Sequence, residues 1–166
     1  MSATPGPEPR ISRPAMVPGY GLPTELPDHI PPWPKVESEL EGARNYWVCT
    51  VSPGGRAHAM PVWGVWFDGA LLFSTDPESR KARNIAANPE VVIHLESGDD
   101  VVILEGRLEG TQATALPVAV FDAYEKKYGI RPDETDANGG WYRLALKKAL
   151  TWEEKDFVNS ALRRQW

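Results

Sequence analysis

The chain has 166 residues and a mass of 18.4 kDa, enough for one folded domain. Its 18 Lys and Arg are outnumbered by 23 Asp and Glu, so the formal net charge is −5. A general nucleic-acid binder relies on a positive surface, and this balance argues against such a partner. The longest uncharged segment, residues 110–121, is too short to cross a membrane as a helix, and the N-terminus has no signal-peptide pattern. We therefore expect a cytoplasmic protein with no membrane partner.

Proline is concentrated at the start of the chain, where 10 of the 16 prolines fall within residues 1–34. Proline has no amide for a sheet ladder and interrupts helices, so these residues predict an extended arm, disordered at its start. Apolar side chains from Tyr20 to Trp33 would let the later part of the arm lie across the body or a partner subunit. Residues 35–166 remain as the folded domain.

The first half of that domain predicts a short helix over residues 35–45, followed by strands. Aromatic and β-branched residues mark a strand over 46–51, and the Pro-Gly-Gly run at 53–55 predicts a turn. A second strand covers residues 56–67. The Asp68-Gly69 pair is a strong hairpin signal and leads into a third strand over 70–75.

The second half mixes helices and strands. A Ser79 cap begins a helix over residues 79–88, which stops before Pro89. A second helix is predicted over 114–128 from apolar residues at every fourth position. Further strands are predicted over residues 90–96, 100–109 and 141–146. About six strands with two or three short helices indicate a mainly β fold, a small antiparallel barrel.

Three cations, Arg80, Lys81 and Arg83, lie at the start of the helix that Ser79 caps. Unpaired amides and the positive end of the helix dipole favour an anion there, and Arg and Lys add donors for a phosphate. Cations at a helix start are otherwise unfavourable by ~0.3–1 kcal/mol each. The pattern therefore favours a phosphate site over the alternative, a solvated basic turn that balances acids such as Glu78.

The strand over residues 56–67 has a second unusual feature. Pro61 lacks an amide, which predicts a sheet edge or a bulge at that point. Gly64 beside Trp63 would let a flat ligand or another backbone come close. Val65 and Phe67 are expected in the core. His58 is expected to be an ordinary strand histidine with its hydrogen bonds satisfied.

Other common sites have no pattern in the chain. There is no Gly-x-Gly-x-x-Gly run, no phosphate loop and no Gly-x-Ser-x-Gly motif. The three histidines are scattered and Cys49 is the single cysteine, so no metal site is expected.

Taken together, the motifs from residue 46 to residue 110 resemble the pyridoxamine 5′-phosphate oxidase-like superfamily of split β-barrels. The resemblance rests on four motifs in order: residues 50–58, residues 60–63, residues 73–75, and residues 79–84 continuing to Asn88-Pro89. It implies a split barrel that binds FMN or the deazaflavin coenzyme F420. It also implies a homodimer with cofactor clefts between its subunits.

The resemblance also assigns roles to residues. Arg80 and Lys81, with Ser79, would hold the cofactor phosphate, and Ser74 and Thr75 would touch phosphate or ribityl groups. The isoalloxazine ring would lie along a wall of four residues. Trp152 would approach the cofactor from the other subunit. The wall residues are Met60, Pro61, Val62 and Trp63.

Departures from the family pattern argue against vitamin B6 chemistry. Gly64 stands where true pyridoxamine 5′-phosphate oxidases carry a substrate-contacting lysine, and Val101 lies near the position of a flavin-bonding glutamine. The sequence also shows no second cluster of charge for a substrate phosphate. We therefore expect a flavin- or deazaflavin-dependent oxidoreductase that transfers hydride to or from a small apolar organic substrate. The alternative is a non-catalytic split barrel that binds a flavin, a haem or a lipid-like ligand. His58, Tyr46 and water are all candidate proton donors, and no catalytic acid is assigned.

Overall fold

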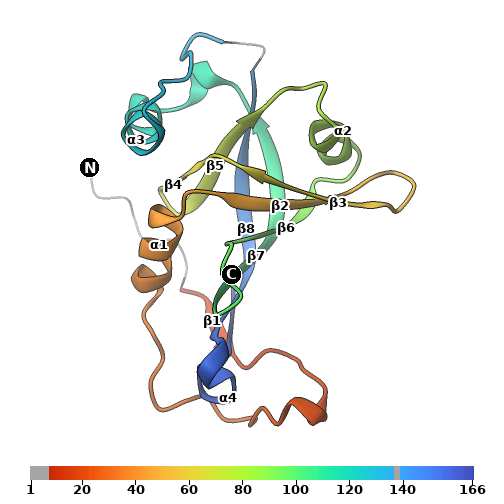
Figure 1. Ribbon diagram of the computed structural model, residues 1–166, viewed down its shortest axis with the longest axis vertical. Helices are drawn as coiled ribbons and strands as arrows, with labels where there is room; N and C mark the ends of the chain where they lie inside the picture. The colour runs from red at the N-terminus through yellow and green to blue at the C-terminus, as the bar shows by residue number, and fades with distance from the viewer. Residues whose placement is uncertain (1–7, 137–138) are drawn as a thin grey trace.

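The computed structural model describes residues 8–136 and 139–166, which form an elongated, mainly β molecule (Figure 1). The α-helices in the described part are α1 (Trp33–Gly42), α2 (Arg80–Ala87), α3 (Val118–Tyr128) and α4 (Phe157–Ser160). The strands there are β1 (Arg10–Ser12), β2 (Tyr46–Val51), β3 (Ala57–Val62), β4 (Val65–Phe67), β5 (Ala70–Thr75), β6 (Glu90–His94), β7 (Asp100–Thr111), β8 (Gly140–Glu153) and β9 (Leu162–Gln165).

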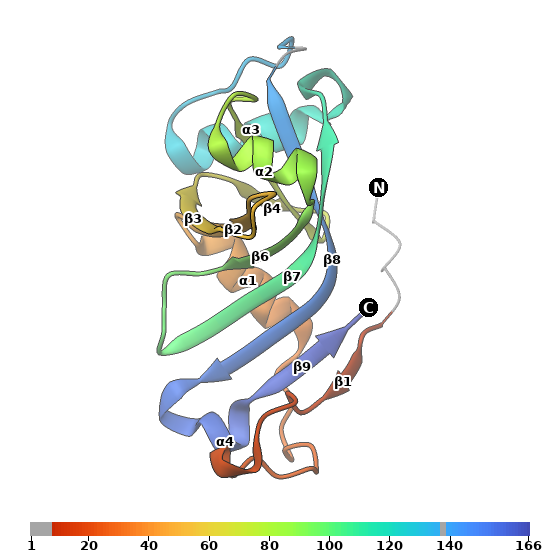
Figure 2. The ribbon, with the colours of Figure 1, turned by 90° about the vertical axis from the view of Figure 1, so that its right-hand side faces the viewer.

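All strand pairs are antiparallel, in the order β1-β9-β8-β7-β6-β2-β3, with β5 joined to both β4 and β8. The long strand β8 links two parts of the molecule. Its first residues pair with β5 in the rolled barrel, and residues 148–151 pair with β9 in the extension below it (Figure 2). The fold is therefore the expected antiparallel split barrel, with nine strands in the described residues where about six were expected.

The barrel interior follows from alternation along its strands. On β2, Tyr46, Val48 and Thr50 are buried, whereas the side chains between them face the other side of the sheet. Their neighbours in the core include Phe73, Ile93, Leu104 and Leu144. A second apolar cluster packs Val120 and Phe121 of α3 against Val65 and Leu72 of the β4–β5 hairpin and against Trp141 of β8. These two clusters hold α2 and α3 on the upper part of the barrel (Figure 1).

Several element boundaries differ from the sequence expectation. The predicted strand over residues 56–67 is two strands, β3 and β4, interrupted at Trp63 and Gly64. Helix α3 begins only after Pro117, which caps it, and residues 113–115 form a separate 3-10 turn. Strand β8 continues to Glu153, seven residues beyond the predicted strand 141–146. The Asp68-Gly69 turn is confirmed, with φ of 49° and 70°, the positive values that such a hairpin requires.

The proline-rich arm folds back along its own chain. Contrary to the expectation that it forms no ladder, Arg10–Ser12 pairs with β9, because these three residues lie between prolines and keep their amides. The Arg13 guanidinium donates to the backbone oxygens of Glu25 and Ala161, and Tyr20 packs against Phe157. The expected disorder at the start of the arm falls mostly on residues 1–7, outside the described residues.

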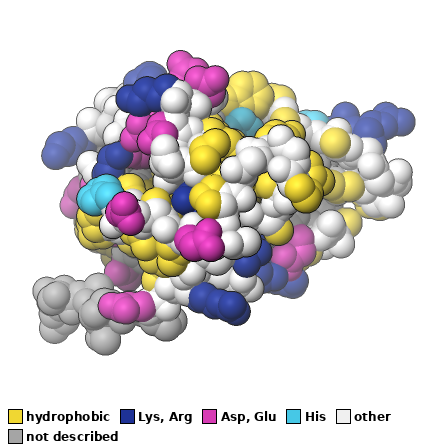
Figure 3. Space-filling model, turned by 90° about the horizontal axis from the view of Figure 1, so that it is seen from below, with side chains coloured by type: hydrophobic (Ala, Val, Ile, Leu, Met, Phe, Trp, Pro, Cys, Tyr) yellow, Lys and Arg dark blue, Asp and Glu magenta, His cyan; other side chains and the backbone are white. Residues whose placement is uncertain are grey.

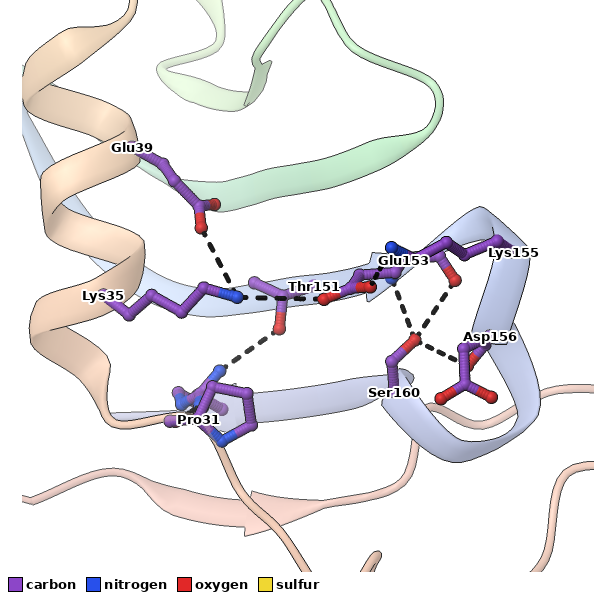
Figure 4. Close-up of polar contacts among 9 residues, drawn as sticks. Pro31, Lys35, Glu39, Thr151, Glu153, Lys155, Asp156 and Ser160 are labelled. Atoms are coloured by element: carbon purple, nitrogen blue, oxygen red, sulfur yellow. Dashed lines mark hydrogen bonds and ion pairs between the residues drawn. The ribbon is translucent and has the colours of Figure 1, made fainter.

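Arg164 joins the arm to the C-terminal strand. Its side chain is 1% exposed and donates to the Pro31 carbonyl and to the Thr151 hydroxyl. Beside it, Lys35 lies between Glu39 and Glu153, and Ser160 bonds to the backbone of Glu153 and Asp156 (Figure 4). Seen from below, apolar side chains are exposed among charged ones (Figure 3). None of the helices in the described ranges is long and apolar enough to cross a membrane.

Candidate functional site

Helix α2 begins with an anion-binding arrangement. The Ser79 hydroxyl accepts a hydrogen bond from the Ala82 amide at 3.1 Å, and its carbonyl accepts from the Arg83 amide. Within the described residues, the amides of Arg80 and Lys81 have no acceptor. Two N–H groups at the positive end of the helix dipole are therefore available to an anion.

Side chains from β5 and α2 are linked beside these amides. Lys81 Nζ donates to Thr75 Oγ1 at 2.6 Å, and Thr75 Oγ1 lies 3.3 Å from Ser79 Oγ. Burial lowers the pKa of Lys81, and the Asp76 carboxylate partly opposes that effect. Arg80 is exposed next to this cluster. The predicted residues Thr75, Ser79, Arg80 and Lys81 thus come together at one corner.

A buried polar bridge fixes α2 to the sheet below it. Asn84, 3% exposed, donates to the Thr50 hydroxyl at 3.0 Å, and that hydroxyl lies 3.5 Å from the His58 carbonyl oxygen. His58 does not match its expectation of satisfied hydrogen bonds, since its Nδ1 is buried without a partner among the described residues. Burial, Arg80 and Lys81 together lower the pKa of His58.

Strand β3 is the edge of the sheet, as Pro61 predicted. Met60 is 46% exposed and Val62 is 8% exposed, although residues two apart on a strand share a face, so exposure on that face rises along β3 from Val62 to Met60. Trp63 follows the strand, is 38% exposed, and stacks on Tyr128 with ring centroids 4.7 Å apart. The wall therefore combines an exposed backbone edge with one anchored aromatic ring.

Of the two partners expected beside Gly64, a flat ligand or another backbone, the structure shows the backbone. A Cβ on this residue would lie 2.7 Å from the Leu72 carbonyl oxygen, so the barrel, and not a ligand, occupies the space beside it. Its amide donates to the Tyr128 hydroxyl at 3.0 Å, and its carbonyl accepts from Lys127 at 3.2 Å. Lys127 also donates to the Tyr46 hydroxyl at 2.8 Å, and burial lowers the pKa of Lys127 to about 8.

Sequence reasoning assigned no role to two cations beside Trp63 and Gly64. Arg44 lies 5.5 Å from the Trp63 ring, and Lys127 of α3 donates to the Gly64 carbonyl. Both come from segments distant in the sequence, so no local motif predicts their charge at this place. Tyr46 is not a proton donor for a substrate. Its side chain is 0% exposed and its hydroxyl donates to the Leu40 carbonyl.

Two predicted residues are not linked to the cluster by hydrogen bonds among the described residues. Ser74 is on β5 opposite Trp141, where it lines a 520 Å³ groove that Thr75, Asp76 and Glu78 also line, so this groove borders the cluster. Trp152 lies near the far end of β8, paired with Val101 and packed against Phe157. Within one chain, the described contacts of Trp152 are therefore with β7 and α4, and not with α2 or β3.

The outer face of the sheet carries a larger groove of about 810 Å³. Its floor includes Cys49, Val51, Ala59 and Val92, and its rim carries charged residues. His58 also lines it, so this outer-face groove reaches the corner at α2. The charged rim residues are Glu90, Glu105, Lys147 and Lys148.

Comparison with known families agrees with this geometry. The family model described as pyridoxamine 5′-phosphate oxidase matches residues 32–153, most of the chain. The chain belongs to the pyridoxamine 5′-phosphate oxidase family. The match covers the cluster at α2 and the wall strand β3, and it ends one residue after Trp152. Among curated proteins no match is found.

Solved structures share the fold of this family. The conserved hypothetical protein Rv2991 from Mycobacterium tuberculosis is 23% identical with a TM-score of 0.62, covering 76% of this chain and 87% of that one. A protein named F420 reductase is 23% identical with a TM-score of 0.55, covering 68% and 94%. An FMN-binding, pyridoxamine 5′-phosphate oxidase-related protein from Nostoc punctiforme is 19% identical with a TM-score of 0.54, covering 76% and 86%. At these identities the likeness establishes the fold.

Proposed function

We propose that the protein is an oxidoreductase that binds FMN or coenzyme F420 and transfers hydride to or from a small organic substrate. One observation carries the proposal: Lys81, Thr75 and Ser79 are linked beside two amides at the start of α2 that have no acceptor among the described residues. Such a site suits a phosphate group. The names of two solved relatives, an F420 reductase and an FMN-binding protein, support this choice of cofactor.

The chain's own residues would hold the cofactor in a defined orientation. Arg80, Lys81 and the free amides of α2 would bind the phosphate, with Thr75 and Ser79 as hydroxyl partners. The edge of β3 and the Trp63 ring would support the flat ring system. The bound cofactor would supply the hydride chemistry, while the protein orients it and excludes water.

We also propose that the working form is a homodimer. The floor of the outer-face groove is apolar, with Val51 and Val92 38% and 37% exposed, and its rim is charged, as in many protein interfaces. Because the groove reaches His58, a second copy on this face would border the phosphate site. The partner's Trp152 is then the candidate for the second wall of the cleft.

True pyridoxamine 5′-phosphate oxidation is the less favoured activity. Gly64 cannot become a lysine without displacing the Leu72 carbonyl, so the expected substrate-contacting lysine has no place on this strand. Arg44 and Lys127 bring positive charge close to Trp63 and Gly64. Lys127 already donates hydrogen bonds to Tyr46 and Gly64, so it does not replace the missing substrate-contacting lysine.

Titration of cofactor-free protein with FMN, and separately with F420, tests the proposal by fluorescence quenching. We expect tight binding of one cofactor and a loss of more than about tenfold in the Arg80→Ala/Lys81→Ala variant, since charge-assisted hydrogen bonds contribute ~1.5–3 kcal/mol each. Arg107→Ala/Lys126→Ala, which removes two exposed cations that line neither the α2 site nor the outer-face groove, is the matched control. Unchanged affinity in the α2 variant would refute the phosphate site. Tight binding without turnover of a substrate panel would instead favour the non-catalytic ligand carrier.

A further inference from the structure

His58 is a half-buried titratable side chain at the site, with a buried Nδ1 atom, that the proposed function leaves without a role. It lies on β3 opposite Thr50, and the Thr50 hydroxyl joins its backbone to Asn84 of α2. The position of His58 relative to α2 is therefore held by a buried bridge. Its imidazole responds to the charges of Arg80 and Lys81, the two residues that begin the helix.

The imidazole has an incomplete set of hydrogen bonds. Nδ1 of His58 is buried and has no partner among residues 8–136 and 139–166. Leaving a buried polar atom unpaired costs roughly 1–3 kcal/mol, and folded proteins keep few such atoms. By contrast, Nδ1 of His94 lies 2.7 Å from the Leu95 carbonyl oxygen. An unsatisfied histidine beside two cations is a group that a bound anion would satisfy.

Burial and the charges of Arg80 and Lys81 lower the pKa of His58, so both disfavour the protonated ring in the absence of an anion. Arg80 and Lys81 approach it from α2, and Asp76, in the loop before α2, acts on Lys81. From β2 it faces the uncharged Thr50. On the groove side the charged residues are of both signs: Glu90, Glu105, Lys147 and Lys148. The neutral ring has one N–H donor, whereas the protonated ring has two.

We infer that His58 is a third ligand of the bound phosphate group and that it takes up one proton from solvent when a dianion binds. This inference rests on the phosphate site of the proposed function. A dianion between Arg80 and Lys81 cancels the charges that oppose protonation of the ring, and it supplies acceptors for the ring's N–H groups. No other bond forms or breaks, so the net change is one proton moved from water to the protein.

The affinity for the anion should change with pH in a direction that can be measured. Because the anion-bound protein holds the proton more tightly than the free protein, linkage requires the anion to bind more tightly as the pH falls through the titration of His58. A shift of one pH unit in the midpoint corresponds to an affinity change of about tenfold. FMN has a phosphate that titrates in the same range. Sulfate keeps its charge there and is the cleaner probe.

Proton NMR of the full chain can follow each imidazole, because the protein has three histidines. The midpoint of His58 would be measured in free protein, in saturating sulfate, and with whichever cofactor binds. His58→Gln assigns its signal, and His94→Gln is the matched control. We expect the His58 midpoint to rise by about one pH unit in both bound forms.

The outcomes separate this inference from the proposed function. If sulfate or the cofactor binds but the His58 midpoint does not move, His58 is not a phosphate ligand, although the phosphate site stands. If neither sulfate nor either cofactor binds, both proposals fail. In the His58→Gln variant, sulfate affinity should lose its dependence on pH, whereas His94→Gln should retain it.

Discussion

At the scale of single residues, Gly64 shows how one missing Cβ shapes the site. It closes the corner between β3 and β4, where its amide and carbonyl bond to side chains of α3 and its free side faces the Leu72 carbonyl. The sequence marked this glycine as unusual, but it could not show which neighbour approaches it. Leu72 lies eight residues later in the chain, and the hairpin turn at Asp68 and Gly69 brings its backbone next to Gly64.

Replacing Gly64 with alanine should therefore destabilise the fold. A Cβ 2.7 Å from the Leu72 carbonyl oxygen forces the strands apart, and overpacking of this kind costs about 1–3 kcal/mol. Urea unfolding would measure the change. Gly98→Ala is the control, because nothing lies within 4 Å of its Cβ position. Equal stability of the two variants would contradict this account of the corner.

At the scale of elements, α2 was predictable and the docking of α3 was not. The α2 boundaries agree with the expected 79–88 because a Ser cap and an Asn-Pro stop are local signals. Strands β2 and β5 match their predicted ranges for the same reason, since they lie between clear turns. The contacts of Lys127 with Tyr46 and Gly64 join segments 81 and 63 residues apart, and no spacing in the sequence encodes them.

The α3 contact also predicts a dependence of stability on pH. Burial lowers the pKa of Lys127 to about 8, so between that pH and its ordinary titration the unfolded chain holds more protons than the folded one. The free energy of unfolding should then rise as the pH increases through about 8 to 10. Lys127→Met keeps the apolar part of the side chain and removes the titrating amine. The rise in the free energy of unfolding with pH should therefore be smaller in this variant, by about 1 kcal/mol once solvent screening is allowed for.

Urea unfolding of this variant between about pH 7 and 9.5 tests the effect below the ordinary titration of tyrosine. Lys126→Met, an exposed change on the same helix, should leave the wild-type profile intact. A parallel profile for Lys127→Met would show that its ammonium is not desolvated at this corner.

At the scale of the whole molecule, the outer-face groove is the surface on which we expect a second copy of the chain to bind. Val92→Arg puts a charge on the apolar floor, which should shift the protein toward monomer and weaken cofactor binding together. Sedimentation and the FMN or F420 titration would report the two effects. Val118→Arg changes a 57% exposed valine on α3 and is the control. A monomer with unchanged cofactor affinity would place the whole site within one chain.

The pairing of β1 with β9 has a consequence for synthesis. Residues 10–12 leave the ribosome before their partner strand, residues 163–165, which lies about 150 positions later in the chain. Such distant pairing is slow to form, and domains assemble while the chain is still growing. The arm can therefore pair only after β9 has been made, and we expect β1 to join the sheet after the barrel strands have paired.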